Sequence, residues 1–192
     1  MKRANYCITI FCMLSVNLYA QYSNKVTILY KSATEFSNRS PSFSFECKSK
    51  SKILLNDFFI KNYVTVKQGD STYRFSKRDL YGYQTCIGQV FRFLNKKELL
   101  LLNKNEDILL YRHQVAKPPL GRTNVTNYYF SIGTEGAIMK LTFKNLKAAF
   151  AGNSGFLNMI DAEFKYNMDI AGYNEELKRY RVNVLLAKSK GK

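Results

Sequence analysis

The stretch YVTVKQGDSTYRFS, residues 63–76, carries the clearest fold signal in this chain. Two runs rich in β-branched and aromatic residues flank Gly69 and Asp70, and in the second run Tyr73 and Phe75 alternate with polar residues. A period of two on either side of a turn sequence is typical of a β-hairpin with one buried face. The stretch therefore predicts two antiparallel strands joined by a tight turn.

Strand-sized segments of the same kind lie on both sides of this hairpin. Upstream, Phe43 and Phe45 alternate with serines, which is the pattern of a half-buried strand. Turn-like NKK and NKNED separate the downstream runs at the short spacing of an antiparallel meander. A loop at 117–124 precedes the last two runs. The further predicted strands are KVTILYK (25–31), SFSFECK (42–48), ILLNDFF (53–59), LYGYQTC (80–86), VFRFLN (90–95), ELLLLNK (98–104), ILLYRHQV (108–115), YYFSIG (128–133) and GAIMK (136–140).

The spacing of apolar residues becomes helical in the last quarter of the chain. Thr142 is the predicted N-cap of a first helix. A last helix is predicted over 169–187, with Asp169 as its N-cap and Glu175 and Arg179 as a pair one turn apart. The apolar stripes are Phe143, Leu146 and Phe150, then Phe156, Ile160 and Phe164, then Ile170, Tyr173, Leu177, Tyr180 and Val184. The whole pattern predicts an α+β fold: an antiparallel meander of about eight strands followed by two or three C-terminal helices packed on the sheet.

The GNSG sequence between the first two predicted helices looks at first sight like the glycine-flanked serine of a hydrolase. The hydrolase motif requires G-x-S-x-G between a strand and a helix, and here both the spacing and the preceding element differ. We interpret Gly152 as a left-handed C-cap, and Asn153 and Ser154 as N-cap residues of the next helix. The sequence thus offers no positive evidence for catalysis, and it predicts no cofactor and no metal site.

Residues 1–20 have the organisation of a secretory signal peptide. Two basic residues precede an apolar run at 7–16, and Ala20 supplies the small residue before a cleavage point. The run is shorter than the roughly 20 apolar residues of a membrane span, although a retained anchor is the alternative. We expect an exported protein, periplasmic or secreted, without a transmembrane span after cleavage.

The remainder, 21–192, has the usual size of one domain with a single core. We expect it to be a single exported α+β domain, mainly β over 21–140 and helical over 141–188.

The chain is strongly basic, with a formal charge of +16 at pH 7. The signal peptide contains Lys2 and Arg3 and no acidic residue, so its removal leaves +14. Such a surplus favours an anionic partner such as phospholipid, lipopolysaccharide or acidic glycan, and export argues against nucleic acid. A solvated, soluble surface is the alternative interpretation.

Two cysteines, Cys47 and Cys86, remain after cleavage. In an oxidising compartment an isolated pair predicts one disulfide, which here closes a loop of about 40 residues. Two buried free thiols are the alternative.

Two strands interleave a cation with aromatic residues, at Tyr73-Arg74-Phe75 and at Phe91-Arg92-Phe93. Aromatic rings can stack on a ligand while arginines hold its negative groups. In the alternative interpretation, the aromatic residues face the core and the arginines face water. The candidate contacts for an anionic ligand are Arg74, Arg92, Tyr73 and Phe91.

Much of the chain resembles a family of small exported proteins of unknown function from Gram-negative bacteria. The resemblance lies in ILLNDFF, YVTVKQGDSTYRFSKRDLYGYQ, VFRFLN, ILLYR and LTFKNLKAAFAGNSGFLNMIDAEFKYNMDIAGYNEELKRYRVN. It implies an exported, single-domain protein, and it brings neither an activity nor site residues. Proline and aspartate usually stand in that family where this chain has Ala151 and Gly152.

The leading functional hypothesis is a non-enzymatic binding or interaction protein of the cell envelope with a basic surface. Its partner is an anionic envelope component or another envelope protein. One alternative is a hydrolase of envelope polymers whose site is assembled from residues distant in sequence. The other is a structural accessory subunit of an envelope complex.

Overall fold

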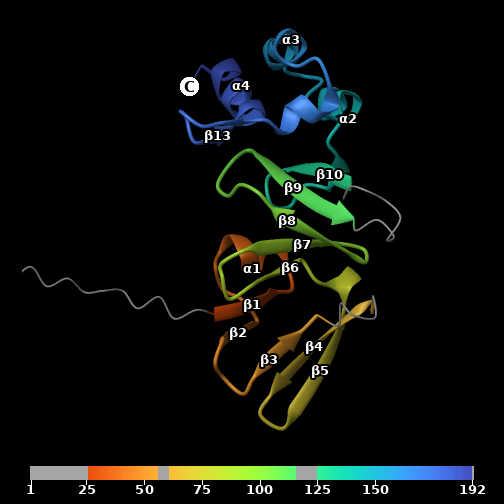
Figure 1. The fold of residues 1–192 in the computed structure, drawn as a ribbon, viewed down its shortest axis with the longest axis vertical. Helices are drawn as coiled ribbons and strands as arrows, with labels where there is room; N and C mark the ends of the chain where they lie inside the picture. The colour runs from red at the N-terminus through yellow and green to blue at the C-terminus, as the bar shows by residue number, and fades with distance from the viewer. Residues whose placement is uncertain (1–25, 56–60, 116–124, 192) are drawn as a thin grey trace, which may run out of the picture.

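The computed structural model describes residues 26–55, 61–115 and 125–191, which form an antiparallel eight-stranded sheet, a smaller sheet and C-terminal helices (Figure 1). The α+β prediction is confirmed. The predicted signal peptide, 1–20, lies outside the described residues, as do most of ILLNDFF and the loop at 117–124. No helix within the described ranges is long and apolar enough to cross a membrane.

The large sheet has the strand order β11-β10-β9-β8-β7-β6-β1-β2. From β6 to β11 each strand pairs with the next along the chain, as the short connections predict. At the other end, β1 lies between β2 and β6. The strands are β1 (Val26–Tyr30), β2 (Phe43–Glu46), β6 (Gly82–Gln84), β7 (Val90–Leu94), β8 (Lys97–Leu101), β9 (Ile108–Val115), β10 (Val125–Ile132) and β11 (Met139–Lys140).

The predicted hairpin is present, but it belongs to a separate three-stranded sheet. This sheet consists of β3 (Lys52–Leu54), β4 (Tyr63–Gln68) and β5 (Ser71–Ser76), and β4 and β5 pair from Tyr63 opposite Ser76 to Gln68 opposite Ser71. Gly69 adopts a positive φ of 58° in the turn, a conformation that glycine reaches without strain. The chain therefore leaves the large sheet after β2 and returns to it at β6.

The large sheet packs on both faces. On one face, Leu29, Tyr83 and Phe93 share a core with Val64 and Val66 of the small sheet. The same face, by strand register, carries the β9 and β10 side chains that pack against the C-terminal helices; they are Ile108, Leu110 and Phe130. The other face packs against the short helix α1 (Ala33–Ser37) and the segment after β10, through a cluster of Val90, Leu99, Leu101, Leu109 and Tyr111. The small sheet and the helices therefore lie at opposite ends of the molecule (Figure 1).

The first two C-terminal helices are α2 (Phe143–Ala149) and α3 (Ser154–Glu163). As predicted, the Thr142 hydroxyl caps α2 and Asn153 caps α3, where its side chain accepts from the Phe156 N–H at 2.9 Å. The interpretation of Gly152 as a left-handed C-cap is wrong, because α2 ends at Ala149 with Phe150 as its C-cap, and Gly152 has no positive φ. Ser154 is the exposed first residue of α3 rather than its cap.

The predicted helix over 169–187 is wrong in its first half. Asn167–Ala171 forms a short 3-10 helix, η3, and is followed by a hairpin of β12 (Tyr173–Asn174) and β13 (Arg179–Tyr180). Only Arg181–Ser189 is α-helical, as α4. Gly172 is extended after η3, and Lys178 takes a positive φ of 51° in the turn, so both residues interrupt a continuous helix.

The polar contacts of this segment explain why the hairpin prevails. The Asp169 carboxylate accepts from the Tyr166 N–H at 2.9 Å within η3, so it does not cap a long helix. Glu175 pairs with Lys178, whereas Arg179 reaches Glu106 and donates from two nitrogens at 2.7 and 2.5 Å. The predicted Glu175–Arg179 pair is therefore absent from this described segment.

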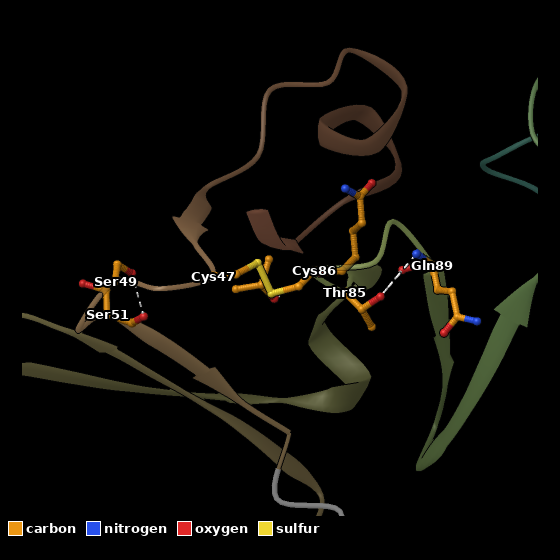
Figure 2. The surroundings of a disulfide bond; sticks show 8 residues. Cys47, Ser49, Ser51, Thr85, Cys86 and Gln89 are labelled. Atoms are coloured by element: carbon orange, nitrogen blue, oxygen red, sulfur yellow. Dashed lines mark hydrogen bonds between the residues drawn. A yellow bond between two sulfur atoms is a disulfide. The ribbon is translucent and has the colours of Figure 1, made fainter. Parts of the chain in front are cut away.

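Cys47 and Cys86 form the predicted disulfide (Figure 2). Cys47 follows β2 and Cys86 follows β6, and their Cα atoms are 5.9 Å apart. The bond thus joins the point where the chain leaves the large sheet to the point where it has returned. The small sheet lies within the loop that the bond closes.

Candidate ligand-binding groove

An open groove lies over β7, β8 and β9 of the large sheet. It has a volume of about 870 Å³. The register places its floor on the face that carries the small sheet at one end and the helices at the other. Its described lining residues are Lys77, Gln89, Phe91, Lys96, Lys97, Glu98, Leu100, Arg112, His113 and Gln114.

Three neighbouring side chains form the floor. Phe91 pairs with Leu100, and Leu100 pairs with Arg112, so the three residues lie side by side across the strands and point to one face. The Phe91 ring stacks on Tyr83, with centroids 4.9 Å apart and planes 7° from parallel. On this floor, the apolar side chain of Leu100 thus lies between the ring of Phe91 and the side chain of Arg112.

A buried ion pair borders the floor on the side of the small sheet. Lys77 is 3% exposed, and its Nζ donates to Glu98 Oε1 at 2.6 Å. The Tyr83 hydroxyl donates to Glu98 Oε2, also at 2.6 Å. Of the described lining residues, Glu98 is the one carboxylate, and its charge is matched by that of Lys77. The remaining lining charges are positive.

Lys96 and Lys97 stand at the tight turn between β7 and β8. Leu94 pairs with Lys97, and Asn95 takes the left-handed φ of 56° that such a short turn requires. Lys97 Nζ lies 3.4 Å from the Tyr129 hydroxyl, while the exposed Lys96 makes no ion pair with the rest of the described chain. Lys97 thus turns its side chain to the opposite face of the sheet, where Tyr129 lies, and Lys96 is the exposed cation at this end of the groove.

Arg112 is the distinctive residue of the groove. It is half-buried in β9, and no hydrogen bond or ion pair to its guanidinium is present in the described structure. A half-buried guanidinium has lost part of its hydration, and an ionised oxygen acceptor compensates for that loss best. The Arg112 guanidinium lies near the Tyr180 hydroxyl, whose pKa burial raises and the charge of Arg112 lowers, and it remains available to a further anionic group.

His113 follows Arg112 in β9, and its side chain points to the opposite face of the sheet, on the side of Tyr111 and Lys97. Its Nδ1 is buried and has no hydrogen-bond partner in the part of the chain that the structure describes. Burial lowers the pKa of His113 below its ordinary value, and the nearby Lys97 lowers it further. The imidazole is consequently held neutral near pH 7.

We expect the protein to lose stability as the pH falls from about 7.5 to about 5.5, across the ordinary histidine pKa of about 6.5. The folded-state pKa of His113 is the lower one, so the unfolded chain takes up the proton first. The stabilisation is present above the unfolded pKa and is lost as the pH falls through the folded pKa. Urea titrations at several pH values should show a shallower loss for His113→Gln than for the wild type. Equal pH slopes for the two proteins would contradict this role of His113.

The four residues proposed from the sequence do not meet at one place. Tyr73 and Arg74 lie on β5 in the small sheet, where the Tyr73 ring packs 5.9 Å from Phe43 and the Arg74 guanidinium lies 5.3 Å from the Tyr63 ring. Phe91 lines the groove.

Arg92 points away from the groove, to the opposite face of the sheet. One of its terminal nitrogens donates to the Tyr111 hydroxyl and the other donates to the Gly136 carbonyl, both at 3.1 Å. Its guanidinium also lies 4.6 Å from the centroid of the Tyr81 ring. Arg92 thus contributes to packing, and Arg112 is the arginine that shares the face of Phe91, with Leu100 between them.

The face on which Arg112 lies can be predicted from the alternation of apolar residues along its strand. In ILLYRHQV, Ile108 and Leu110 occupy the inward-facing positions, and Arg112 continues the same alternation. By the same alternation, Arg92 stands between the inward-facing Phe91 and Phe93 and falls on the opposite face.

Comparison of the chain with protein-family models, curated proteins and solved structures finds no match. The resemblance to exported proteins of Gram-negative bacteria stays a prediction. The functional proposal therefore rests on the geometry of the groove.

Proposed function

We propose that this protein is an exported, non-enzymatic binding protein that holds an acidic glycan of the cell envelope in the groove over β7–β9. This proposal rests on Arg112, a half-buried arginine without an internal anionic partner, which lies across Leu100 from Phe91 on the same face. A guanidinium binds a carboxylate or a phosphate in a forked geometry, and an aromatic floor accommodates the apolar face of a sugar ring. The exposed Lys96 adds positive charge at the end of the groove.

A periplasmic or secreted location agrees with this function. The Cys47–Cys86 disulfide supports an oxidising compartment, where acidic envelope polymers are accessible.

Replacing Arg112 with glutamine is expected to weaken binding of an oligogalacturonate about 10- to 100-fold, because a charge-assisted hydrogen bond is lost. The measurement is isothermal titration calorimetry at about 20 mM salt, repeated at about 500 mM, where screening weakens the wild-type affinity. Arg74→Gln is the matched control, since it removes an equal charge from the small sheet.

Equal losses in the two variants would mean that general surface charge, and not the groove, binds the polymer. Absence of wild-type binding at low salt would rule out acidic glycans of this class as ligands. Binding of anionic lipid vesicles with the same dependence on Arg112 would instead assign the groove to a lipid headgroup.

A second candidate function, a structural accessory subunit, is favoured by exposed apolar residues near the C-terminus. Tyr166 is 71% exposed, Met168 80% and Leu177 53%. These residues lie in η3 and the β12–β13 hairpin or directly beside them. If they bind another envelope protein, the double variant Met168→Ser/Leu177→Ser should reduce the native mass of the isolated complex, and Arg112→Gln should not.

The hydrolase alternative has less support from the groove, because its described carboxylate, Glu98, is bonded to both Lys77 and Tyr83. Ser154 lies on α3 and is not one of the described residues lining the groove.

A further inference from the structure

The opposite face of the large sheet carries a second hollow, with a volume of about 490 Å³. Its floor is formed by residues of five neighbouring strands: Ile28 and Tyr30 of β1, Gln84 of β6, Val90 of β7, Leu101 of β8 and Leu109 of β9. This volume lies in the range of about 300–1,000 Å³ that is usual for small-molecule sites. The floor is mainly apolar, which distinguishes this hollow from the basic groove on the other face.

The sides of the hollow are fixed by contacts between distant segments. The Ser37 hydroxyl at the end of α1 lies 3.0 Å from the Thr134 hydroxyl, and Tyr81 donates to the Thr134 carbonyl at 3.1 Å. The Phe36 ring packs between the rings of Tyr30 and Tyr81, at 5.3 and 5.2 Å. The hollow is therefore preformed, and a ligand that enters it need not order the protein.

Two cations lie among the lining residues without an opposing charge. Arg39 and Lys104 are exposed, and neither makes an ion pair in the described ranges. Burial raises the pKa of the Tyr30 hydroxyl while the nearby charge of Arg39 lowers it, so Arg39 lies close to this floor residue. The nearby carboxylate of Glu106 is already bonded to Arg179.

We infer that this hollow binds a single-chain anionic amphiphile, whose hydrocarbon chain lies on the apolar floor and whose carboxylate meets Arg39 and Lys104. An apolar ligand without charge would leave both cations unused, and a small polar anion would make no use of the apolar lining. The combination of an apolar floor with cations at its edge thus matches a fatty-acid-like molecule. This site is independent of the glycan groove, because the two lie on opposite faces of the sheet.

The test is calorimetric titration of the purified protein with dodecanoate, below the concentration at which the probe forms micelles. Saturable binding is expected, and acetate, which lacks the chain, should not compete. The variant Arg39→Asn/Lys104→Gln should bind dodecanoate about tenfold more weakly, since charge-assisted contacts are lost. Asparagine is chosen because Arg39 has a positive φ of 54°, which asparagine tolerates.

The variant Ile28→Phe fills the floor and should weaken dodecanoate binding by a similar factor, with circular dichroism confirming its fold. Arg112→Gln should leave dodecanoate affinity unchanged, which separates this site from the glycan groove. Unsaturable uptake of dodecanoate would overturn the inference. So would equal affinities for the wild type and the charge variant, which alters only exposed residues.

Discussion

Replacing Phe156 with alanine is expected to lower the free energy of unfolding by about 3–5 kcal/mol, the usual cost of removing a buried aromatic ring. Phe156 is 0% exposed and belongs to the core that joins α3 to β9 and β10. Its ring meets Phe150 edge to face, with centroids 4.8 Å apart. The cavity left by alanine therefore lies where the helical layer is attached to the sheet.

Urea denaturation followed by far-ultraviolet circular dichroism measures this loss. Met168→Ala is the control, because Met168 is exposed and surface substitutions usually change stability by less than about 0.5 kcal/mol. A loss below about 1 kcal/mol for Phe156→Ala would mean that the helices do not pack on the sheet through this residue.

Removing the disulfide with the double variant Cys47→Ser/Cys86→Ser is expected to cost about 2–4 kcal/mol. The two cysteines are 39 residues apart, and the bond restricts that loop in the unfolded chain. Thermal unfolding of the wild type with reductant should show the same decrease in midpoint as the double variant. Reductant should not change the double variant.

An unchanged midpoint for the double variant would show that the contacts of the small sheet alone hold the loop closed. In that case the bond would protect the chain against another process, such as proteolysis of the exposed turns.

The local pattern of the sequence predicted most elements because their periods reflect burial directly. The strand at 108–115 coincides with β9, and the hairpin at 63–76 has the expected pairing. The sequence did not reveal that this hairpin belongs to a separate sheet. That arrangement depends on β1 pairing with β6, and hydrophobic alternation identifies a strand without naming its partner.

The error at 169–187 has a similar origin. The apolar stripe fitted a helix, yet Tyr173 and Leu177 are exposed in the structure. The hairpin there is held by the contact of Arg179 with Glu106, which lies 73 residues earlier and leaves no trace in a local pattern. A tertiary contact of this kind overrides helical propensity.

The candidate site was predicted only in part. Phe91 lines the groove, but its neighbour Arg92 must point to the other face because side chains alternate along a strand. The partners of Arg92 include the carbonyl of Gly136, 44 residues further on. The placement of Arg112 on the same face as Phe91, across Leu100, depends on the register of three strands, which the sequence alone does not determine.

The placement of β1 between β2 and β6 also bears on how the chain folds. β1 and β2 are close in sequence and can form early, whereas the contact from Thr27 to Gln84 joins residues 57 positions apart. Sheets that depend on such distant pairings fold slowly, because the loop must close before the contact stabilises it. Until β6 arrives, one edge of β1 remains open to pairing with another chain. We therefore expect the pairing of β1 with β6 to be the slow step in folding. Before that pairing forms, the chain should be most prone to aggregation.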